Sequence, residues 1–478
     1  MLIGGTTRNF GDLMGGEETG VQSPSGYKEY AFNGKLLFAL RENMQLTLAS
    51  QFLNQSHVPV YHKVVLENYA VNEFQPQQRL MNYARLNIQG RKKVFDQVKF
   101  IASWQQNTEN TAAQKNGSNL VQMDSNRVNT LGFVADVTSA FSKIWSANSG
   151  MEYYHDNVSS SRFINTTDNS NPPPERRGLY PDDSKYGNFS VYSLHHFTLN
   201  NWVIDGGIRF NAFNIKIDDK DLGEVKFTPE ALVFNLGTIY NINRANHLYG
   251  TVSNGFRAPN IDDMGTLGIV DFRYEVPAYD LKPEKSVNFE AGYKLNLPKF
   301  QANVAGYYMD LNHLITRVKV EGEFIDGYQV YKKENVEEAF ITGCEAAILW
   351  KVIQNVNVNS SISYTYGHNI TKDEPLRRIP PLNGKVTATY NLKNFFVSGE
   401  LLFAGMQDRL AEGDKSDNRI PAGGTPAWEV VNLFAGYQLA MVKLKVGFEN
   451  IFNEDYRTHG SGINGVGRNA WVMMNIGF

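Results

Sequence analysis

The chain has 478 residues, of which 42% are hydrophobic and 12% aromatic, and its formal net charge is −3. No stretch approaches the ~18–20 consecutive apolar residues of a membrane-spanning helix, and the small net charge argues against a nucleic-acid partner. The single cysteine, Cys344, excludes an intrachain disulfide. The 24 tyrosines and 29 phenylalanines are typical of strands. A barrel of strands can still cross a membrane with this composition, because only alternate residues face lipid.

Strand candidates follow one another along most of the chain. About nineteen stretches have the alternation or the composition of strands, whereas none is predicted in residues 1–27. In chain order the predicted strands are residues 28–40, 43–55, 80–90, 94–106, 129–140, 145–157, 187–198, 202–215, 228–241, 245–254, 284–296, 299–315, 336–351, 354–367, 382–392, 395–405, 428–439, 442–452 and 469–478.

Several of these strands have one apolar face and one polar face. In residues 442–449, every second residue is apolar, and Lys443, Lys445, Gly447 and Glu449 lie between them. A lysine at the middle of a bilayer costs about 2–4 kcal/mol, so the polar faces are expected to line a wet interior. Because backbone groups in lipid need partners within the protein, the sheet must close into a barrel.

The last ten residues have the same pattern. Ala470, Val472, Met474, Ile476 and Phe478 form a wholly apolar face, and about ten residues are enough for a tilted strand to cross a bilayer. The chain stops on this strand. The sequence therefore predicts that Phe478 ends the strand that closes the barrel.

The connections alternate between tight turns and long polar loops. The long loops are predicted at about residues 56–79, 107–128, 158–186, 255–283, 316–335, 406–427 and 453–468. In outer-membrane barrels the short turns face the periplasm and the long loops face outside. With the carboxy terminus in the periplasm, every tight turn falls on the periplasmic side. The sequence thus predicts an antiparallel transmembrane β-barrel in the outer membrane.

The odd number of strands suggests an incomplete barrel, because single-chain bacterial barrels have even strand numbers. Three further strands at the front give 22, the class of plugged transporters. On this count residues 1–27 are the end of an extracellular loop, residues 28–478 form the barrel, and a plug domain is absent. Residues 1–8 have no basic and apolar regions of a signal peptide, which is consistent with a natural start upstream.

Motifs in the second half of the chain resemble those of TonB-dependent outer-membrane receptors. From about residue 245 to the end, the resemblance is carried by residues 254–259 (NGFRAP), 276–286 (VPAYDLKPEKS), 343–345 (GCE), 378–381 (RIPP) and 448–456 (FENIFNEDY), together with Gly467, Arg468 and Phe478. The resemblance implies a plug inside the barrel and ligand import driven by the TonB complex. It also implies a ligand-binding surface on the outer loops.

A subgroup resemblance concerns the ligand. Residues 58–64, 77–80 and 178–184 are similar to haem and haemoglobin receptors. In these receptors, a histidine between the two motifs that correspond to residues 254–259 and 276–286 often ligates haem. Residues 260–275 contain no histidine and offer Met264 and Tyr274 instead. The missing histidine argues against haem as the ligand. No intrinsic cofactor is expected, and haem enters only as a candidate for the transported ligand.

Other candidate ligand contacts lie in loops of the predicted outer side. Imidazole is a common ligand of haem iron, and His62 and His459 lie in segments that resemble the family. For any single loop histidine, simple exposure to solvent is the commoner role. Paired charges at Asp262–Asp263, which could bind calcium, and at Lys332–Lys333 and Arg377–Arg378 are more often solvated rim charges than sites.

The turn at Phe256 to Pro259 is expected to be structural. The Arg257 guanidinium can brace the loop by bidentate bonding to a carboxylate such as Glu284, while Pro259 and Pro283 stiffen the two ends of the loop. A contact between Arg257 and the ligand is the alternative.

No catalytic or phosphate-binding motif is present in the sequence, so an enzyme is not expected. The sequence favours a receptor that binds a scarce nutrient, iron–haem or a similar chelate, for TonB-energised import. An unplugged pore or a non-functional truncated receptor is the alternative, and a soluble β-rich binding protein is a third possibility.

Overall fold

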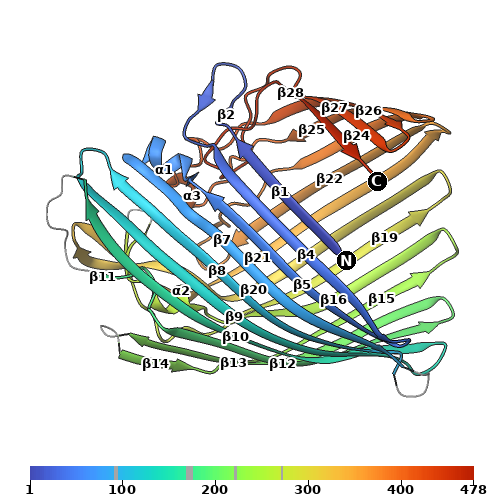
Figure 1. The fold of residues 1–478 in the computed structure, drawn as a ribbon, viewed down its shortest axis with the longest axis horizontal. Helices are drawn as coiled ribbons and strands as arrows, with labels where there is room; N and C mark the ends of the chain where they lie inside the picture. Colours follow the sequence, from blue (N-terminus) through green and yellow to red (C-terminus); the bar gives the residue numbers. More distant parts are fainter. Residues whose placement is uncertain (91–94, 168–175, 220–222, 271–272, 478) are drawn as a thin grey trace.

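The computed structural model describes residues 1–90, 95–167, 176–219, 223–270 and 273–477. Within these residues, twenty strands of eight residues or more form one curved antiparallel sheet in which each strand pairs with its neighbours along the chain (Figure 1). These strands are β1 (Leu2–Phe10), β4 (Tyr27–Arg41), β5 (Met44–Ser56), β7 (Tyr69–Gln89), β8 (Gln97–Lys115), β9 (Leu120–Ala140), β10 (Trp145–Thr166), β12 (Ser184–Leu199), β13 (Trp202–Asp219), β15 (Glu230–Asn241), β16 (Asn246–Arg257), β19 (Glu284–Asn296), β20 (Phe300–Ile325), β21 (Tyr328–Ile353), β22 (Val356–Asn369), β24 (Asn383–Leu392), β25 (Phe395–Ala404), β26 (Trp428–Leu439), β27 (Val442–Glu449) and β28 (Asn469–Ile476).

Shorter elements lie in the connections between these strands. They are β2 (Leu13–Met14), β3 (Val21–Gln22), β6 (Val58–Pro59), β11 (Arg176–Arg177), β14 (Gly223–Phe227), β17 (Gly268–Val270), β18 (Arg273–Val276), β23 (Glu374–Pro375) and the helices α1 (Tyr61–Leu66), α2 (Ile261–Gly265) and α3 (Glu412–Lys415). No helix in the described ranges is long and apolar enough to span a membrane.

Short and long connections lie at opposite ends of the strands, as the sequence predicts. Tight turns such as residues 42–43, 200–201 and 393–394 share one end, and the three helices lie at the other (Figure 1). We call these the short-turn end and the long-loop end. Near the short-turn end, the ring centroids of Trp202 and Tyr240 are 4.6 Å apart. Aromatic pairs of this kind are typical of a strand's boundary with the membrane interface.

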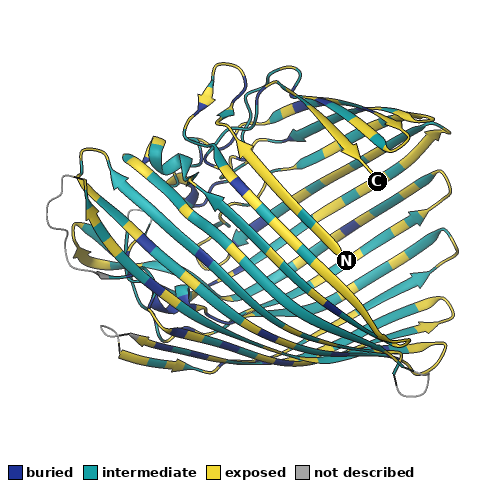
Figure 2. Cartoon of the chain, in the orientation of Figure 1, coloured by how far each residue is buried: buried dark blue, intermediate teal, exposed yellow. Residues whose placement is uncertain are grey.

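Along many strands, exposed residues are interspersed with less exposed ones (Figure 2). On β28, Val472 is 76% exposed and Met474 is also exposed. The neighbouring Trp471 instead donates a hydrogen bond from Nε1 to Glu449 Oε1, 3.0 Å away on β27. The apolar faces are therefore outside, and the polar partners lie on the concave side.

The structure differs from the prediction in residues 1–27, which are not only loop. Strand β1 pairs with β4, from Leu2 opposite Lys35 to Phe10 opposite Tyr27, and a hairpin of β2 and β3 follows it. The glycines and threonines of β1 give it little hydrophobic alternation, so the sequence pattern missed it. The described residues thus hold twenty long strands rather than nineteen, and a total of 22 stays a prediction.

Two of the predicted long loops are mostly strand. Residues 107–128 are divided between β8 and β9, with four residues between them, and residues 316–335 between β20 and β21, with two residues between them. Residues 107–128 are rich in Asn, Gln, Thr and Ser, and residues 316–335 are rich in charged residues, so both stretches resemble polar loops in the sequence. The ladder of backbone hydrogen bonds continues nonetheless, because each strand has a paired neighbour.

The first and last strands are linked through loops at the long-loop end. In the described part of the chain, β1 pairs only with β4 and β28 only with β27. Gln22 and Asn464 exchange two hydrogen bonds, of 3.0 and 2.8 Å. The backbone N–H of Glu17 also donates to Asn453 O, at 2.8 Å. The hairpin near the amino terminus is therefore fastened to the loop that precedes the final strand.

Candidate functional site

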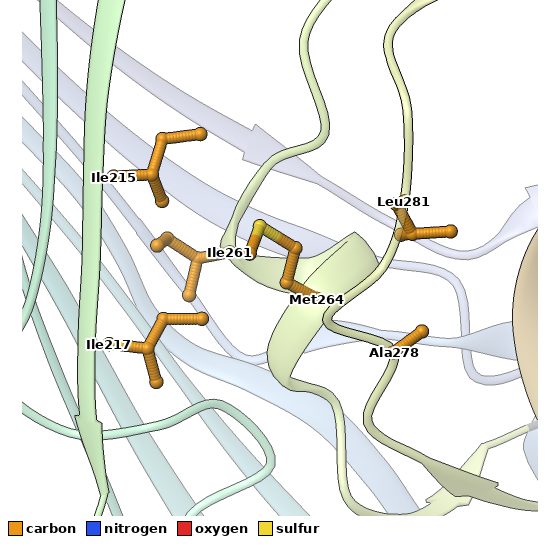
Figure 3. Packing of buried hydrophobic residues seen from close by; sticks show 6 residues of the cluster. All are labelled: Ile215, Ile217, Ile261, Met264, Ala278 and Leu281. Carbon is orange, nitrogen blue, oxygen red and sulfur yellow. The ribbon is translucent and has the colours of Figure 1, made fainter. Parts of the chain in front are cut away.

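The loops of the long-loop end fold inward and cover the concave side of the sheet. Residues 258–270 and 273–283, between β16 and β19, make a buried apolar contact there. Ile261, Met264, Ala278 and Leu281 of this loop pack against Ile215 and Ile217 of β13 (Figure 3). The two isoleucines lie on alternate positions of β13, so that one face of the strand holds the loop.

The prediction of Met264 as a ligand contact does not fit its position. Met264 is 1% exposed, and its side chain points into the cluster in Figure 3. A flexible thioether readily fills an irregular apolar space. Met264 therefore anchors the loop.

Arg257 braces this loop through two carboxylates. Its Nε and Nη2 donate to the two oxygens of Glu284, the second at 2.9 Å, and its Nη1 donates to Asp263 Oδ2 at 2.5 Å. Asp263 also closes a capping box with Asn260 at the start of α2. These contacts use the guanidinium for structure, the role that the sequence favoured over a ligand contact.

Lys333 is the second brace of the loop, and the interpretation of Lys332–Lys333 as rim charges was wrong for this residue. The Lys333 side chain is 6% exposed, and its Nζ lies 2.7 Å from Asp262 Oδ2 and 3.1 Å from Glu275 Oε1. Arg317 Nε donates to the other oxygen of Glu275, at 2.5 Å. The pair Asp262–Asp263 is therefore occupied by Lys333 and Arg257, which accounts for its negative charge without calcium.

The same lysine controls the ionisation of Asp262. Burial raises the pKa of this carboxyl, but the hydrogen bond and charge of Lys333 outweigh burial and leave the pKa below its ordinary value. Asp262 is thus a carboxylate at neutral pH, and the loop is held to β21 by an ion pair.

A cavity of about 420 Å³ is lined by five arginines from four separate parts of the chain. We call it the arginine cavity and define it by Arg273, Arg317, Arg377, Arg378 and Arg419, with Glu67 and Asp417. Arg273 lies in β18 and Arg317 in β20, whereas the other three arginines lie in the loops before β24 and after α3. The interpretation of Arg377–Arg378 as rim charges does not account for the distant arginines that converge on them in the structure, and no local motif indicates this convergence.

Asp417 is the common partner of the loop arginines. It accepts hydrogen bonds from Arg378 Nη2 at 2.8 Å, from Arg377 Nη2 at 3.3 Å, and from Nε and Nη2 of Arg419, both at 2.8 Å. Burial raises its pKa, but Arg419 and Arg378 outweigh burial and hold the pKa of Asp417 well below its ordinary value. The loops before β24 and after α3 are therefore joined at one ionised carboxylate.

The two predicted histidines lie beside this cavity. His62, in α1, has its Nε2 3.9 Å from Glu67 Oε1, and Glu67 also accepts a hydrogen bond from Asn418. His459 lines an adjoining cavity of about 600 Å³ that Arg378 also lines. The His459 Nδ1 lies 2.8 Å from Thr425 Oγ1.

His459 has the properties of a neutral imidazole. Burial lowers its pKa, with the charge of Asp414 opposing the shift. Its Nε2 is buried and, among the described residues, has no hydrogen-bond partner. A neutral ring with an unbonded nitrogen can serve as a metal ligand. Within the described ranges, no group of three or more His, Cys, Asp or Glu residues has an arrangement that could hold a metal ion.

The remaining predicted residues lie around the braced loop. Tyr274 is in β18, opposite Val330 of β21 in a parallel pairing. Phe256 stacks on Phe213 with the ring centroids 5.7 Å apart, and Pro259 is fully buried while Pro283 is half-buried. Phe478 lies outside the described residues.

The comparison with protein families gives one match that covers most of the chain. Residues 30–453 match the family model described as TonB dependent receptor-like, beta-barrel. The chain is 25% identical over 302 residues to an iron-regulated outer membrane virulence protein of Vibrio cholerae, covering 59% of this chain and 44% of that protein. It is 23% identical to the vitamin B12 transporter BtuB of Photobacterium profundum, covering 64% and 43%. The chain thus spans less than half the length of these relatives.

Solved structures of similar fold cover nearly the whole chain. The copper transporter OprC superposes with a TM-score of 0.82 at 16% identity, covering 100% of this chain and 75% of that one. The haemophore receptor HasR of Serratia marcescens, in complex with its haemophore HasA and haem, gives 0.78 at 16% identity, covering 99% and 75%. At such identities the likeness concerns the fold alone.

Proposed function

Because the chain belongs to the family of TonB-dependent receptor β-barrels, we propose that it is the ligand-binding barrel of a receptor for a scarce nutrient, an iron–haem or similar metal chelate, whose import is energised through TonB. The chain is a β-barrel protein of the outer membrane. Its long-loop end faces outside, as the short turns of such barrels face the periplasm.

The observation that carries this proposal is the inward folding of the loops at the long-loop end. Loops that only covered a pore rim would be solvated, whereas these are tied to each other and to strands through buried ion pairs at Lys333 and Asp417. The two adjoining cavities that result, of about 420 and 600 Å³, are in the size range of small-molecule sites. A fixed, concave and polar outer surface supports ligand capture over free diffusion.

His459 is the residue that we propose as a contact to the metal of the ligand. Its ring is neutral, its Nε2 has no hydrogen-bond partner among the described residues, and it lines the larger cavity. Since the Nε2 atom is buried, the loop of residues 450–468 must shift for the contact to form. His62 is half-buried next to Glu67, and its role as a second contact is also a proposal.

The test is iron-limited growth of the native strain, with the gene for this protein intact or deleted, on haem or ferric citrate as the sole iron source. We expect the deletion to abolish growth on at least one of these sources, and removal of TonB to have the same effect. Growth that is unchanged by the deletion on both sources would overturn the proposal.

A further inference from the structure

The arginine cavity has more hydrogen-bond donors than acceptors. A guanidinium carries five N–H donors and no acceptor, whereas an ionised carboxylate has about four lone-pair positions. Asp417 already accepts four bonds from arginine side chains. Glu67 accepts a bond from Asn418 and lies near His62. The two acidic groups that line the cavity are therefore engaged. Asp414 and Glu275 pair with Arg377 and Arg317.

Two arginines show this surplus directly. In the described part of the chain, the Arg378 guanidinium donates one hydrogen bond, from Nη2 to Asp417. Arg273 lies over the ring of Tyr331, with 4.9 Å between its guanidinium carbon and the ring centroid, a contact that uses the face of the group and not its N–H donors. Among the described residues, the other N–H donors of these two guanidinium groups have no protein acceptor, and we infer that they are available to a ligand.

The arrangement of the arginines indicates the chemistry of that ligand. Arg273 and Arg317 belong to strands, while Arg377, Arg378 and Arg419 belong to loops that Asp417 holds together. A planar fork of donors matches the two oxygens of a carboxylate. A ligand with carboxylates at more than one point can therefore bind the strand arginines and the loop arginines together.

Building on the receptor function proposed above, we propose that the arginine cavity binds the carboxylate groups of a small polycarboxylate metal chelate. The carboxylates would take the donors that Asp417 and Glu67 leave over. The carboxylates could come from a hydroxycarboxylate chelator or from porphyrin propionates, and separate probes distinguish these two sources.

The experiment is isothermal titration calorimetry of the full chain in detergent with citrate, ferric citrate, haem and inorganic phosphate. We expect citrate and ferric citrate to bind, with affinity that falls as salt is raised because the contacts are electrostatic. Binding of haem but neither citrate probe would assign the carboxylates to porphyrin propionates and still support the cavity. Phosphate binding as tight as citrate would overturn the choice of carboxylate, and no binding of any probe would overturn the whole assignment.

Variants test whether the cavity itself is the site. Arg378→Gln is expected to weaken citrate binding about 10- to 100-fold, the range of one or two charge-assisted hydrogen bonds. Arg378→Lys keeps the charge but loses the fork, and should recover only part of the affinity. Glu67→Gln removes a negative charge from the lining and should tighten binding. Arg244→Gln is the matched control, because Arg244 is exposed in a turn of the short-turn end. Equal affinities for the four variants would overturn the proposal.

The outcome separates this inference from the receptor function. If growth on haem and ferric citrate does not depend on the gene but Arg378→Gln still weakens citrate binding, the receptor function is wrong and the cavity assignment stands. If growth depends on the gene but the arginine variants bind and grow like the parent protein, the receptor function stands and the cavity assignment is wrong.

Discussion

Removal of the Lys333 ammonium group should release the loop of residues 258–283 from β21 without unfolding the barrel. Lys333→Met retains the length of the side chain but leaves Asp262 and the nearly inaccessible Glu275 without their shared cation. Breaking a buried pair by removing one partner costs about 3–5 kcal/mol. Arg317 still neutralises Glu275, so we expect the lower end, about 3 kcal/mol, which is roughly a hundredfold in the opening equilibrium of the loop.

Hydrogen–deuterium exchange of the purified protein measures this opening. Peptides from residues 258–270 and 273–283 should exchange roughly a hundredfold faster in Lys333→Met, while peptides of β20 and β21 near the short-turn end keep their protection. The matched control is Lys332→Met on the same strand. Lys332 is 33% exposed and lies 3.5 Å from Asp280, which is 79% exposed, and exposed pairs contribute about 0–1 kcal/mol. Equal exchange in the two variants, or no change in Lys333→Met, would refute the reasoning.

Three further outcomes follow from the same loops. The pKa of Asp262 is depressed, so its ion pair with Lys333 contributes fully at neutral pH. This contribution is lost only as the pH falls below the ordinary pKa of an aspartate and through the lower folded-state pKa. Proteolysis of the loop should be constant from pH 8 to pH 5 and rise in more acidic buffer, and a rise already at pH 6 would contradict this. Met264→Ala should cost about 2–5 kcal/mol of local stability, and Met264→Leu less than about 1.5 kcal/mol. Calorimetry should show unchanged ligand affinity in Met264→Leu. A loss of affinity in Met264→Leu would return Met264 to the ligand site. Gln22→Ala removes both hydrogen bonds to Asn464, each with a net contribution of about 0.5–1.5 kcal/mol. This variant should increase cleavage of the amino-terminal hairpin by protease, while growth on iron sources is retained. Unchanged cleavage would show that this contact does not fasten the hairpin.

The elements that the sequence predicted well are those whose two faces meet different solvents. Strands such as β27 and β28 alternate apolar and polar residues because lipid lies on one side and water on the other. The strands recognised by this contrast also defined the tight turns between them and placed these turns at one end of the sheet. The outer parts of β8 and β20 are instead rich in polar and charged residues, so strand was predicted there as loop.

The sequence by itself also determined the brace between Arg257 and Glu284 at the ends of the loop of residues 258–283, because these residues lie in the recognisable motifs of residues 254–259 and 276–286. Only the tertiary structure decided which charges are buried and which distant residues meet. Lys332 and Lys333 are adjacent in the sequence, yet one is exposed and the other is enclosed by Asp262 and Glu275. Arg273 and Arg419 are far apart along the chain and line one cavity, because the packing of loops across the barrel mouth depends on long-range contacts that no local pattern records.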